Sequence, residues 1–395
     1  MQEIPKLRAL QVIAEVVRTR STVAAADAAH ISQPAVTQTV AKLEAAVGEV
    51  LFTRTGTGME PTEPGRRFAQ RIGRAFDQLH LAERELGVPG LGGRVTSVQL
   101  RTLVAAVEAG SFTLAAAKLG VSQPSVNRAM RDLESLCGRP LLARTPQGLE
   151  PTREARGLAR LAALALAEIR QGLEELREWR GQMTGRVSVG CLPLARSHLL
   201  PEAITGLLAR YPEAQVRIID GPYAEQLHEL RHGGLDLIVG ALRLPPPTPD
   251  IEQEVLFVEP LSIVVRAGHP ILAEGEPTAA ALAALDWIAP RDGTPARAHF
   301  AGFFAAAGVK PPRHIIECSS LIASRGLLMQ SDRAALLSAS QVRQEVEAGY
   351  LAVLPQPLPG TERPIGLTVR KGWQPTRVQA ALMELLRQGA GEGGK

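Results

Sequence analysis

The chain has 395 residues with a formal net charge of +4, and 45% of its residues are hydrophobic against 21% charged. This length exceeds one ordinary domain, and this composition excludes a disordered tail. Charges interrupt the first twenty residues and no apolar run reaches the roughly 18 residues that span a bilayer, so we expect a cytoplasmic protein without leader peptide or membrane partner.

The first half of the chain contains an internal duplication. Ser32 recurs as Ser122 and Thr62 recurs as Thr152, an offset of 122 minus 32, or 90, residues, and the register holds between them without a gap. We therefore predict two copies of one small domain, called copy one and copy two below.

Each copy is predicted to contain three short helices. In copy one, apolar spacing places the first from about Leu7 to Val17, and an alanine-rich stretch places the second at Thr22 to Ala29. Ser32 is a suitable N-cap, and Pro34 falls in the first turn of a third helix whose apolar stripe runs from Val36 to Val47. Two short helices joined by a tight turn are typical of a helix-turn-helix.

The outward face of the third helix carries polar residues in both copies, and a basic turn follows it. Such side chains reach base edges or phosphates in a major groove, and a basic turn can contact phosphate as a wing. An ordinary solvated helix face is the alternative. The candidate DNA-binding residues are Ser32, Gln33, Pro34, Thr37, Gln38, Lys42, Arg54, Ser122, Gln123, Pro124, Ser125, Asn127, Arg128, Arg131 and Arg144.

A long helix with one apolar stripe follows each wing, from Thr62 to Leu86 and from Thr152 to Arg180. We favour contacts with a second chain for the longer helix, and docking on its own domain is the alternative. The two helices can also pack antiparallel within one chain, which would let one polypeptide present two recognition helices. The glycine-rich segment Gly87–Gly93 is the expected domain boundary.

From Gly185 onward, strands alternate with helices, which predicts an open, mainly parallel sheet. The strands are expected at Arg186–Gly190, Gln215–Asp220 and Leu235–Gly240, and the helices at Ser197–Arg210 and Tyr223–Arg231.

An extended stretch from Val255 to Val265 is expected to cross into a second lobe. That lobe would hold the strands around Trp287–Ile288, Ile315–Ile316 and Ala335–Leu337. The chain would then return to the first lobe for Leu351–Leu354 and Ile365–Val369 and end in a helix over Thr376–Arg387.

Ligands of open α/β folds bind beyond the carboxyl ends of strands, where helix N-termini offer free N–H groups. Residues at such points can bind hydroxyls or a carboxylate, and plain helix capping by Ser and Thr is the alternative. The candidates are Arg196, Ser197, Arg291, Asp292, Thr294, Ser319 and Ser320.

No metal, cofactor or catalytic group is expected. Cys137, Cys191 and Cys318 lack a CxxC spacing, and we expect no metal site among the eight histidines, of which His228 and His232 stand four residues apart. Neither a GxSxG motif nor a phosphate-binding glycine loop lies beside a suitable strand and helix. We expect inert, buried thiols, with redox sensing at Cys191 and Cys318 as the alternative.

Copy two carries a specific motif: Gly110–Thr113, Ala115–Ala116, Leu119, Val121–Val126, Leu133–Glu134, Leu141–Leu142, Arg144, Gly148–Leu149 and Pro151–Thr152. In these residues it resembles the DNA-binding domain of LysR-type transcriptional regulators. Copy one resembles the same domain but departs from it at Thr22, where copy two has Phe112, and at Asp27–Ala29. The family usually has one such domain, and this chain has two.

The second half resembles the effector domain of the same regulators, which is similar to two-lobed periplasmic binding proteins of type 2. The matching residues are Leu200–Pro201, Tyr211–Pro212, Gly234–Leu237, Gly268–Pro270 and Trp287. Leu192–Ser197 and Gly240–Arg243 look most like the branch tied to sugar metabolism and galactose-binding-protein control.

The resemblance implies an α+β multidomain regulator, not an enzyme, that binds double-stranded DNA. A small-molecule effector, a sugar or an organic acid, would close the lobes, and the long helix would carry that change to the DNA-binding domains. Homo-oligomers (dimers or tetramers) through the linker helices and RNA polymerase are further implied partners. The expected divisions are 1–61 and 98–151 (winged helix-turn-helix domains), 62–97 (linker helix and hinge), 152–182 (linker helix) and 183–390 (effector domain).

Two alternatives stay open. Copy one can be a module that contacts proteins, so that only copy two binds DNA. The chain can also be a small-molecule-binding protein or enzyme without DNA function, which would predict a leader peptide or a catalytic constellation.

Overall fold

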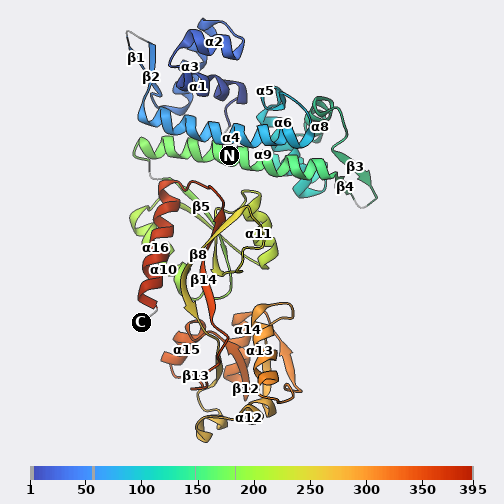
Figure 1. The fold of residues 1–395 in the computed structure, drawn as a ribbon, viewed down its shortest axis with the longest axis vertical. Coiled ribbons are helices and arrows are strands. Elements are labelled where there is room, and N and C mark those ends of the chain that lie inside the picture. Colours follow the sequence, from blue (N-terminus) through green and yellow to red (C-terminus); the bar gives the residue numbers. More distant parts are fainter. Residues whose placement is uncertain (1–3, 56–57, 147, 183, 394–395) are drawn as a thin grey trace.

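The computed structural model describes residues 4–55, 58–146, 148–182 and 184–393. Three parts follow one another along the long axis of the molecule: a helical part formed by the first half of the chain, then a first and a second α/β lobe (Figure 1). This order confirms the predicted fold class.

The duplication is confirmed residue by residue. Copy one consists of α1 (Leu7–Thr19), α2 (Thr22–Ala29), α3 (Gln33–Val47), β1 (Phe52–Thr55) and β2 (Gly58–Pro61). Copy two consists of α6 (Ser97–Ala109), α7 (Phe112–Leu119), α8 (Gln123–Cys137), β3 (Leu142–Thr145) and β4 (Gly148–Pro151). Each element of copy two begins and ends 90 residues after its counterpart, and both strand pairs are antiparallel wings.

One carboxylate fixes the wing to the recognition helix in each copy. Glu44 Oε1 accepts hydrogen bonds from the backbone N–H groups of Leu51 at 2.8 Å and Phe52 at 3.1 Å. Glu134 Oε1 makes the equivalent pair of bonds in copy two, at 2.8 and 3.2 Å. These bonds satisfy backbone donors that the strand pairing leaves free, so the wing is held in one orientation.

The copies differ at two turns that require a left-handed backbone. Gly110 and Gly120 end the first two helices of copy two with φ of 60° and 68°. Copy one has Arg20 and His30 at these positions, with φ of 53° and 52°. A side chain in this conformation costs roughly 1–2 kcal/mol that glycine avoids. Copy one is therefore the more strained of the two.

The two linker helices, α4 (Glu63–Leu86) and α9 (Arg153–Trp179), pack against each other along their lengths within the one chain (Figure 1). Their contacts run antiparallel: Arg67 lies over Trp179, Arg71 pairs with Glu175, Arg74 with Glu168 and Glu85 with Arg160. We call this contact the α4–α9 seam.

The preferred expectation for the longer helix was wrong. Its apolar stripe is buried by α4 and α6 of its own chain, not left for a second chain. Trp179, an apolar residue near the end of the predicted helix that we expected to lie on the stripe, is 48% exposed. The antiparallel arrangement within one chain is confirmed.

A single hydrophobic core connects both copies through the seam. Ile13 of copy one, Ile72 of α4, Leu161 of α9 and Leu103 and Met130 of copy two belong to one continuous cluster. Because protein interiors are close-packed, such a core resists displacement of one copy relative to the other. After α4, the glycine-rich segment forms the short helix α5 (Leu91–Arg94).

The first lobe is a sheet of strand order β6-β5-β7-β14-β8. Its elements are β5 (Arg186–Cys191), α10 (Leu199–Arg210), β6 (Gln215–Asp220), α11 (Tyr223–Arg231), β7 (Leu237–Ala241), β8 (Ile251–Glu259), β14 (Arg363–Arg370) and α16 (Arg377–Gly393). The first three strands are parallel, and β14 is antiparallel to both of its neighbours, so β8 runs in the direction of the first three and the sheet is mainly parallel, as predicted.

The second lobe is a sheet of order β11-β10-β12-β9-β13. It holds β9 (Ser262–Arg266), α12 (Ala279–Ala284), β10 (Asp286–Ala289), α13 (Pro295–Ala306), β11 (Ile315–Glu317), α14 (Leu321–Gln330), β12 (Arg333–Leu337), α15 (Arg343–Glu347) and β13 (Leu351–Val353), with 3-10 turns at Pro270–Glu274 and Ala339–Val342.

The chain crosses between the lobes where expected, from β8 to β9, and returns in β14. The expectation that Leu351–Leu354 lies in the first lobe was wrong. The strand β13 pairs with β9, and the Leu351 side chain is buried in the core of the second lobe.

Candidate nucleic-acid interface and ligand cleft

The recognition helices α3 and α8 begin as their sequences predict. Ser122 is the N-cap of α8; its Oγ accepts from Ser125 N at 3.4 Å and lies 2.8 Å from Ser125 Oγ. Ser32 occupies the same position in α3 but makes no side-chain cap bond. Pro34 and Pro124 lie in the first turn, where a missing N–H costs nothing. The start of α8 is therefore better fixed than the start of α3.

Several candidate side chains on these helices are exposed and unpaired. Gln38 and Lys42 of α3 and Arg128 and Arg131 of α8 make no hydrogen bond or ion pair with any other residue that the structure describes. They are free to bind a ligand.

Other candidates are partly satisfied within their own copy. Gln33 Nε2 donates to Thr22 Oγ1 at 3.1 Å, and Thr37 Oγ1 donates to the Gln33 carbonyl at 3.3 Å. Asn127 Nδ2 donates to the Gln123 carbonyl at 3.2 Å. These bonds orient the side chains along the helix and would have to be exchanged or extended on binding.

Each wing carries an arginine at the same position of its first strand. Arg54 is exposed on β1 and faces Met59 across the strand pair. Arg144 occupies the same position on β3, opposite Leu149, and its side chain lies outside the described part of the structure. A hollow of about 430 Å³ lies between α8 and the wing of copy two, and Asn127 and Arg131 line it.

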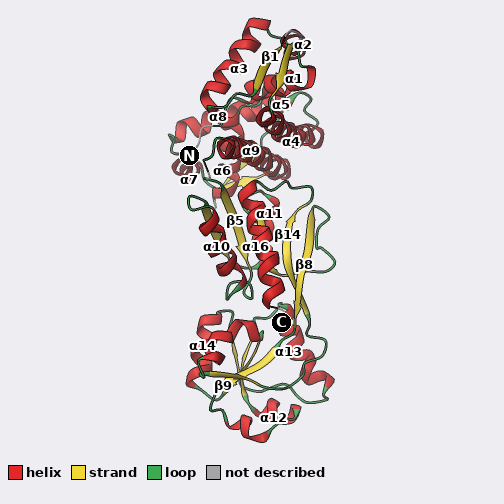
Figure 2. Ribbon diagram, turned by 90° about the vertical axis from the view of Figure 1, so that its left-hand side faces the viewer, coloured by secondary structure: helices red, strands yellow, loops and turns green. Residues whose placement is uncertain are grey.

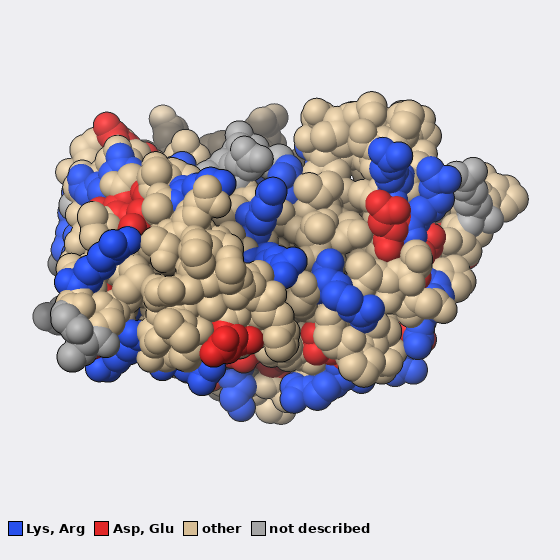
Figure 3. Space-filling model, turned by 90° about the horizontal axis from the view of Figure 1, so that it is seen from above, with Lys and Arg blue, Asp and Glu red and all other residues tan. Residues whose placement is uncertain are grey.

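The recognition helices lie on the same side of the molecule. In Figure 2, α3 and α8 both lie to the left of α4, above the two lobes. Seen from above, this end of the molecule shows more Lys and Arg than Asp and Glu (Figure 3). Both copies are therefore placed to contact one polyanionic ligand.

Each linker helix also supports the recognition helix of the other copy. Arg180, which ends α9, donates from Nη1 to the carbonyl of Val47 at 2.8 Å, at the carboxyl end of α3. A cation is favourable there because the helix dipole is negative at that end. The short helix α5, which follows α4, contacts α8 in turn.

The two lobes face each other through the carboxyl edges of their sheets. The pairing of Ala241 with Ile365 places the end of β7 at the start of β14, the returning strand. The pairing of Leu337 with Ser262 places the end of β12 at the start of β9, just after the crossing. Both carboxyl edges therefore lie at the crossing segments, where α/β folds bind ligands.

In the first lobe, Arg196 and Ser197 lie at this edge. Arg196 forms an ion pair with Asp220 at 3.0 Å, and its Nε donates to the Cys191 carbonyl at 3.3 Å. Ser197 Oγ is buried without a hydrogen-bond partner among the described residues. Arg196 is thus already neutralised, whereas Ser197 retains unused hydrogen-bonding capacity.

In the second lobe, two candidates serve as helix caps, the alternative role. Thr294 Oγ1 accepts from Arg297 N at 3.3 Å, and Ser320 Oγ accepts from Ala323 N at 3.3 Å. Asp292 pairs with Arg297 at 3.1 Å. Arg291 and Ser319 are exposed at the ends of the neighbouring strands β10 and β11.

The sequence analysis missed the residues that meet between the lobes. Arg243, directly after β7, lies over the Tyr223 ring at 4.7 Å. Arg363 donates to Ser338 Oγ, and Glu259 Oε1 accepts from Ser340 N at 3.2 Å. In the sequence, only the position of Arg243 just beyond a predicted strand indicates a ligand-binding role. The pairs Arg363–Ser338 and Glu259–Ser340 join segments far apart in the chain, so no local pattern reveals them.

Polar atoms without partners are concentrated in this region. Tyr223 OH, Glu259 Oε2, Arg363 Nε and Ser340 Oγ are buried and have no hydrogen-bond partner within the described ranges. Burial also lowers the pKa of Arg243 and of Arg363. Buried polar atoms are ordinarily satisfied, so this region has the capacity to bind a polar ligand.

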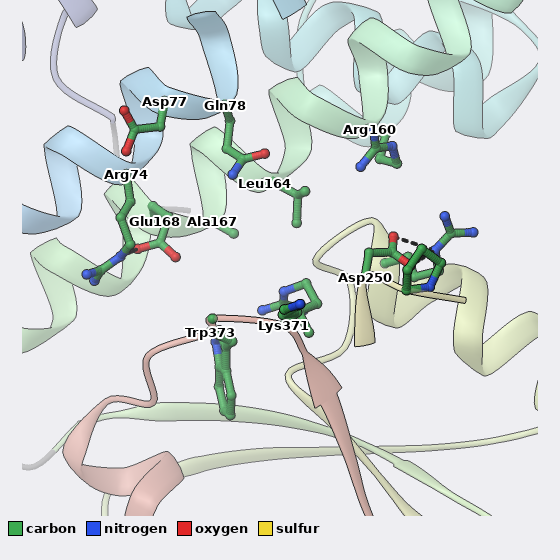
Figure 4. A pocket seen from close by; sticks show the side chains of 14 residues that line it. Arg74, Asp77, Gln78, Arg160, Leu164, Ala167, Glu168, Asp250, Lys371 and Trp373 are labelled. Atoms are coloured by element: carbon green, nitrogen blue, oxygen red, sulfur yellow. Dashed lines mark hydrogen bonds and ion pairs between the residues drawn. The ribbon is translucent and has the colours of Figure 1, made fainter. Parts of the chain in front are cut away.

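A cavity of about 420 Å³ lies between the α4–α9 seam and the first lobe (Figure 4). Arg74, Gln78 and Arg160 line it from the helices, and Lys371 and Trp373 line it from the lobe. The cavity therefore lies at the junction between the DNA-binding copies and the lobes that form the ligand cleft.

A chain of hydrogen bonds runs beside this cavity. Arg71 Nη1 donates to Gln171 Oε1 at 2.9 Å, Gln171 Nε2 donates to Asp236 Oδ1 at 3.4 Å, and Ser188 N donates to Asp236 Oδ2 at 2.7 Å. Burial raises the pKa of Asp236, although the Ser188 bond opposes the shift. These contacts link α4, α9 and the first sheet directly.

No helix among the described residues is long and apolar enough to cross a membrane. No group of three or more His, Cys, Asp or Glu residues in the described ranges is arranged to hold a metal ion. Cys137 and Cys191 are buried and Cys318 is partly buried.

Comparisons with known proteins agree with this arrangement. The family "Bacterial regulatory helix-turn-helix protein, lysR family" matches twice, over residues 7–66 and 98–156, and "LysR substrate binding domain" matches residues 180–391. The chain is 35% identical to the HTH-type transcriptional regulator GalR of Pseudomonas putida over 98% of both chains.

Solved structures match a shorter part of the chain. CbnR, a LysR family transcriptional regulator, is 26% identical with a TM-score of 0.50, and the match covers 74% of this chain and 98% of CbnR. A full-length OxyR variant from Pseudomonas aeruginosa shares the fold, with 23% identity, a TM-score of 0.55 and coverage of 75% and 94%. About a quarter of this chain therefore has no counterpart in these two structures.

The twofold helix-turn-helix match, the substrate-binding match over more than half of the chain and the full-length relative lead to one conclusion. The chain belongs to the LysR family of bacterial transcription regulators, which bind DNA and a small-molecule effector, and it carries the helix-turn-helix of that family twice.

Proposed function

We propose that both copies bind double-stranded DNA, with α3 and α8 in the major groove and Arg54 and Arg144 of the wings beside the backbone. The observation that supports this most directly is the set of exposed, unpaired side chains on α3 and α8, because polar groups left unsatisfied by the fold are available to bases and phosphates. The same observation speaks against copy one being a protein-contacting module alone.

A salt titration tests this function. The full chain would be titrated against duplexes selected from a random library, with fluorescence anisotropy as the readout. Because phosphate contacts release counterions, affinity should fall steeply as salt rises. The double variant Arg128→Ala/Arg131→Ala should weaken binding at least tenfold, and Gln38→Ala/Lys42→Ala should weaken it several-fold. Arg18→Ala, at an exposed position on α1, is the matched control. Salt-independent or absent binding would refute the proposal.

The effector is proposed to bind between the two carboxyl edges and to carry a carboxylate. Arg243 makes hydrogen bonds only to carbonyls of its own loop and has no acidic partner among the described residues. Arg363 lies next to it, at the start of the paired strand β14, where it donates to Ser338 Oγ beside buried polar atoms without partners. Two half-buried guanidinium groups recognise a carboxylate better than an uncharged sugar. Between a sugar and an organic acid, these two arginines favour an organic acid.

Matched ligand pairs test the effector class. Benzoate against benzamide and galactonate against galactose would be screened by thermal shift with the full chain. Acids alone are expected to raise the melting temperature, and Arg243→Met should abolish that shift while leaving DNA affinity within about twofold. Stabilisation by the neutral members would contradict a carboxylate effector.

The chain of bonds from Ser188 through Asp236 and Gln171 to Arg71 joins the amino-end edge of the first sheet to the DNA-binding copies, so that a movement of the first lobe on effector binding would be transmitted to them. The proposal extends to a cytoplasmic homo-oligomer that contacts RNA polymerase, for which family membership is the support. Since the α4–α9 seam is already buried within one chain, oligomer contacts would use other surfaces.

A further inference from the structure

The two copies are held as one rigid unit, and this fixes how they can meet a duplex. The α4–α9 seam contains a buried cation, Arg71, which is 2% exposed and bonded to Glu168, Gln171 and Glu175 of α9. Gly172 brings the helices close: a Cβ there would lie 2.9 Å from the side chains of Phe68 and Arg71. The seam is close-packed and internal to the chain, and it combines a hydrophobic core with buried ion pairs.

The seam has approximate twofold symmetry. Glu85 and Glu175 stand one repeat apart, and each pairs with an arginine of the opposite helix, Arg160 and Arg71; the position equivalent to Arg160 is Gln70, the neighbour of Arg71, so the symmetry is approximate. Arg180 at the end of α9 supports α3, and α5 at the end of α4 supports α8. A single chain thus places its two recognition helices in equivalent positions about one axis, on one side of the seam (Figure 2).

The helix α4 has about the length of one duplex turn. With 24 residues, α4 is about 36 Å long at ~1.5 Å per residue. One turn of duplex measures roughly 34–36 Å, and symmetry-related recognition helices read half-sites one turn or a multiple apart on the same face.

The two recognition helices do not carry the same side chains. At equivalent positions, α3 has Thr37 and Gln38 where α8 has Asn127 and Arg128. Glutamine suits adenine, whereas arginine suits guanine. One turn further along, Ala41 of α3 stands where α8 has Arg131. The helices therefore cannot prefer the same base sequence.

We propose that one chain occupies both halves of its operator and that the two halves differ in sequence. This inference rests on the proposed DNA-binding function and adds its stoichiometry and site: one polypeptide per pair of unlike half-sites, bound in a single orientation. An operator without symmetry thereby gives the bound regulator a direction relative to the gene.

Selection from a random duplex library with the full chain tests the site. Two unlike half-sites on one face of the duplex are expected. Substituting Gln38→Ala should relax base preference in one half only, and Arg128→Ala in the other only. Enrichment of an inverted repeat with identical halves, or of one half-site alone, would overturn the inference while leaving DNA binding intact. If no duplex is enriched at all, both the inference and the proposed function fail.

Native mass spectrometry on the selected duplex tests the stoichiometry. One chain per pair of half-sites is expected, and any larger assembly should keep that ratio when duplexes carrying several pairs are used. Two chains on one pair of half-sites would overturn the inference, whatever the sequence of the site.

An exchange of recognition residues provides a gain-of-function test. The variant Ala35→Ser/Thr37→Asn/Gln38→Arg/Ala41→Arg gives α3 the outward residues of α8 at these four positions. Its selected site should become an inverted repeat of the half-site that α8 reads in the parent chain. That half-site is the one whose base preference Arg128→Ala relaxes. Arg18→Ala, outside the recognition helices, should keep the asymmetric site. A variant that folds, binds and still selects the parental site would contradict the inference.

Discussion

Arg71 of α4 is buried in the seam, and its Nη1 lies 3.1 Å from Glu168 Oε2 of α9, a residue 97 positions later in the chain. Burial opposes the charge, but the hydrogen bonds and charges of Glu175 and Glu168 raise the pKa of Arg71 above its ordinary value. The guanidinium therefore stays charged and ties together the helices that lead from the two DNA-binding copies.

Replacing Arg71 should cost far more stability than replacing an exposed arginine. The variant Arg71→Met leaves Glu175 without its cation and Glu168 with Arg74 alone, and we expect the unfolding free energy to fall by about 3 kcal/mol. Urea unfolding of the full chain, followed by circular dichroism, measures this.

The control for that variant is Arg18→Met, because Arg18 pairs with Glu15 on an exposed surface. Its cost should stay within about 1 kcal/mol. Equal effects of the two variants would mean that the seam does not depend on its buried cation.

The backbone strain at the left-handed turns of copy one can be relieved by glycine. His30→Gly gives copy one the residue that copy two has at Gly120, and stability should rise by about 0.5–1 kcal/mol, less than the full strain because glycine also gains entropy in the unfolded chain. The reverse change, Gly120→His, should lower stability by a similar amount. Differential scanning calorimetry would register both, and a loss on His30→Gly would show that the imidazole makes a compensating interaction.

The duplication made the N-terminal half readable from sequence. Ser32 and Ser122 marked the same helix start in both copies, the N-caps of α3 and α8. The alanine-rich stretch before Ser32 gave the bounds of α2 to the residue, Thr22–Ala29. The partner of the α9 stripe was not readable in the same way, since a stripe such as Leu158 to Leu176 shows that a helix face is buried but not which helix covers it.

The sensor half shows where local patterns stop being informative. The segment Leu351–Leu354 was predicted to be extended, but the sequence pattern cannot say which sheet a strand joins, and β13 pairs with β9 of the second lobe. Arg243 and Arg363 escaped notice because they come together only through the return of β14 to the first sheet. Thr294 and Ser320 cap α13 and α14, which is the role that helix-capping preferences predicted as the alternative to ligand binding.

Thiol reactivity should separate the cysteines. Burial raises the pKa of Cys191 to about 12, so almost no thiolate exists at neutral pH. Burial also raises the pKa of Cys137, whereas Cys318 is partly exposed at the end of β11. Iodoacetamide followed by peptide mass spectrometry should therefore modify Cys318 well before the other two, and all three equally in urea. Rapid labelling of native Cys191 would revive the redox-sensing alternative.

Glu174 on α9 should make stability depend on pH. Burial, and then the charge of Asp236, raise its pKa from 4.5 to about 7, and the other charged groups around it are Arg170, Arg186 and Glu178. The folded chain thus holds a proton that the unfolded chain has already released between these two values. Below about pH 4.5 both states are protonated and the group costs nothing, whereas through pH 7 stability falls by an amount on the order of 3 kcal/mol.

Glu174→Gln removes that charge at constant shape, so it should leave stability below pH 4.5 unchanged and raise it above pH 7. Glu213→Gln, which removes one carboxylate from an exposed loop, is the matched control and should retain the parental slope. Urea unfolding at a series of pH values would compare the three chains. A parental slope that persists in Glu174→Gln would assign the pH dependence to Asp236 instead, because burial also raises the pKa of that carboxyl at the junction of α9 with the first sheet.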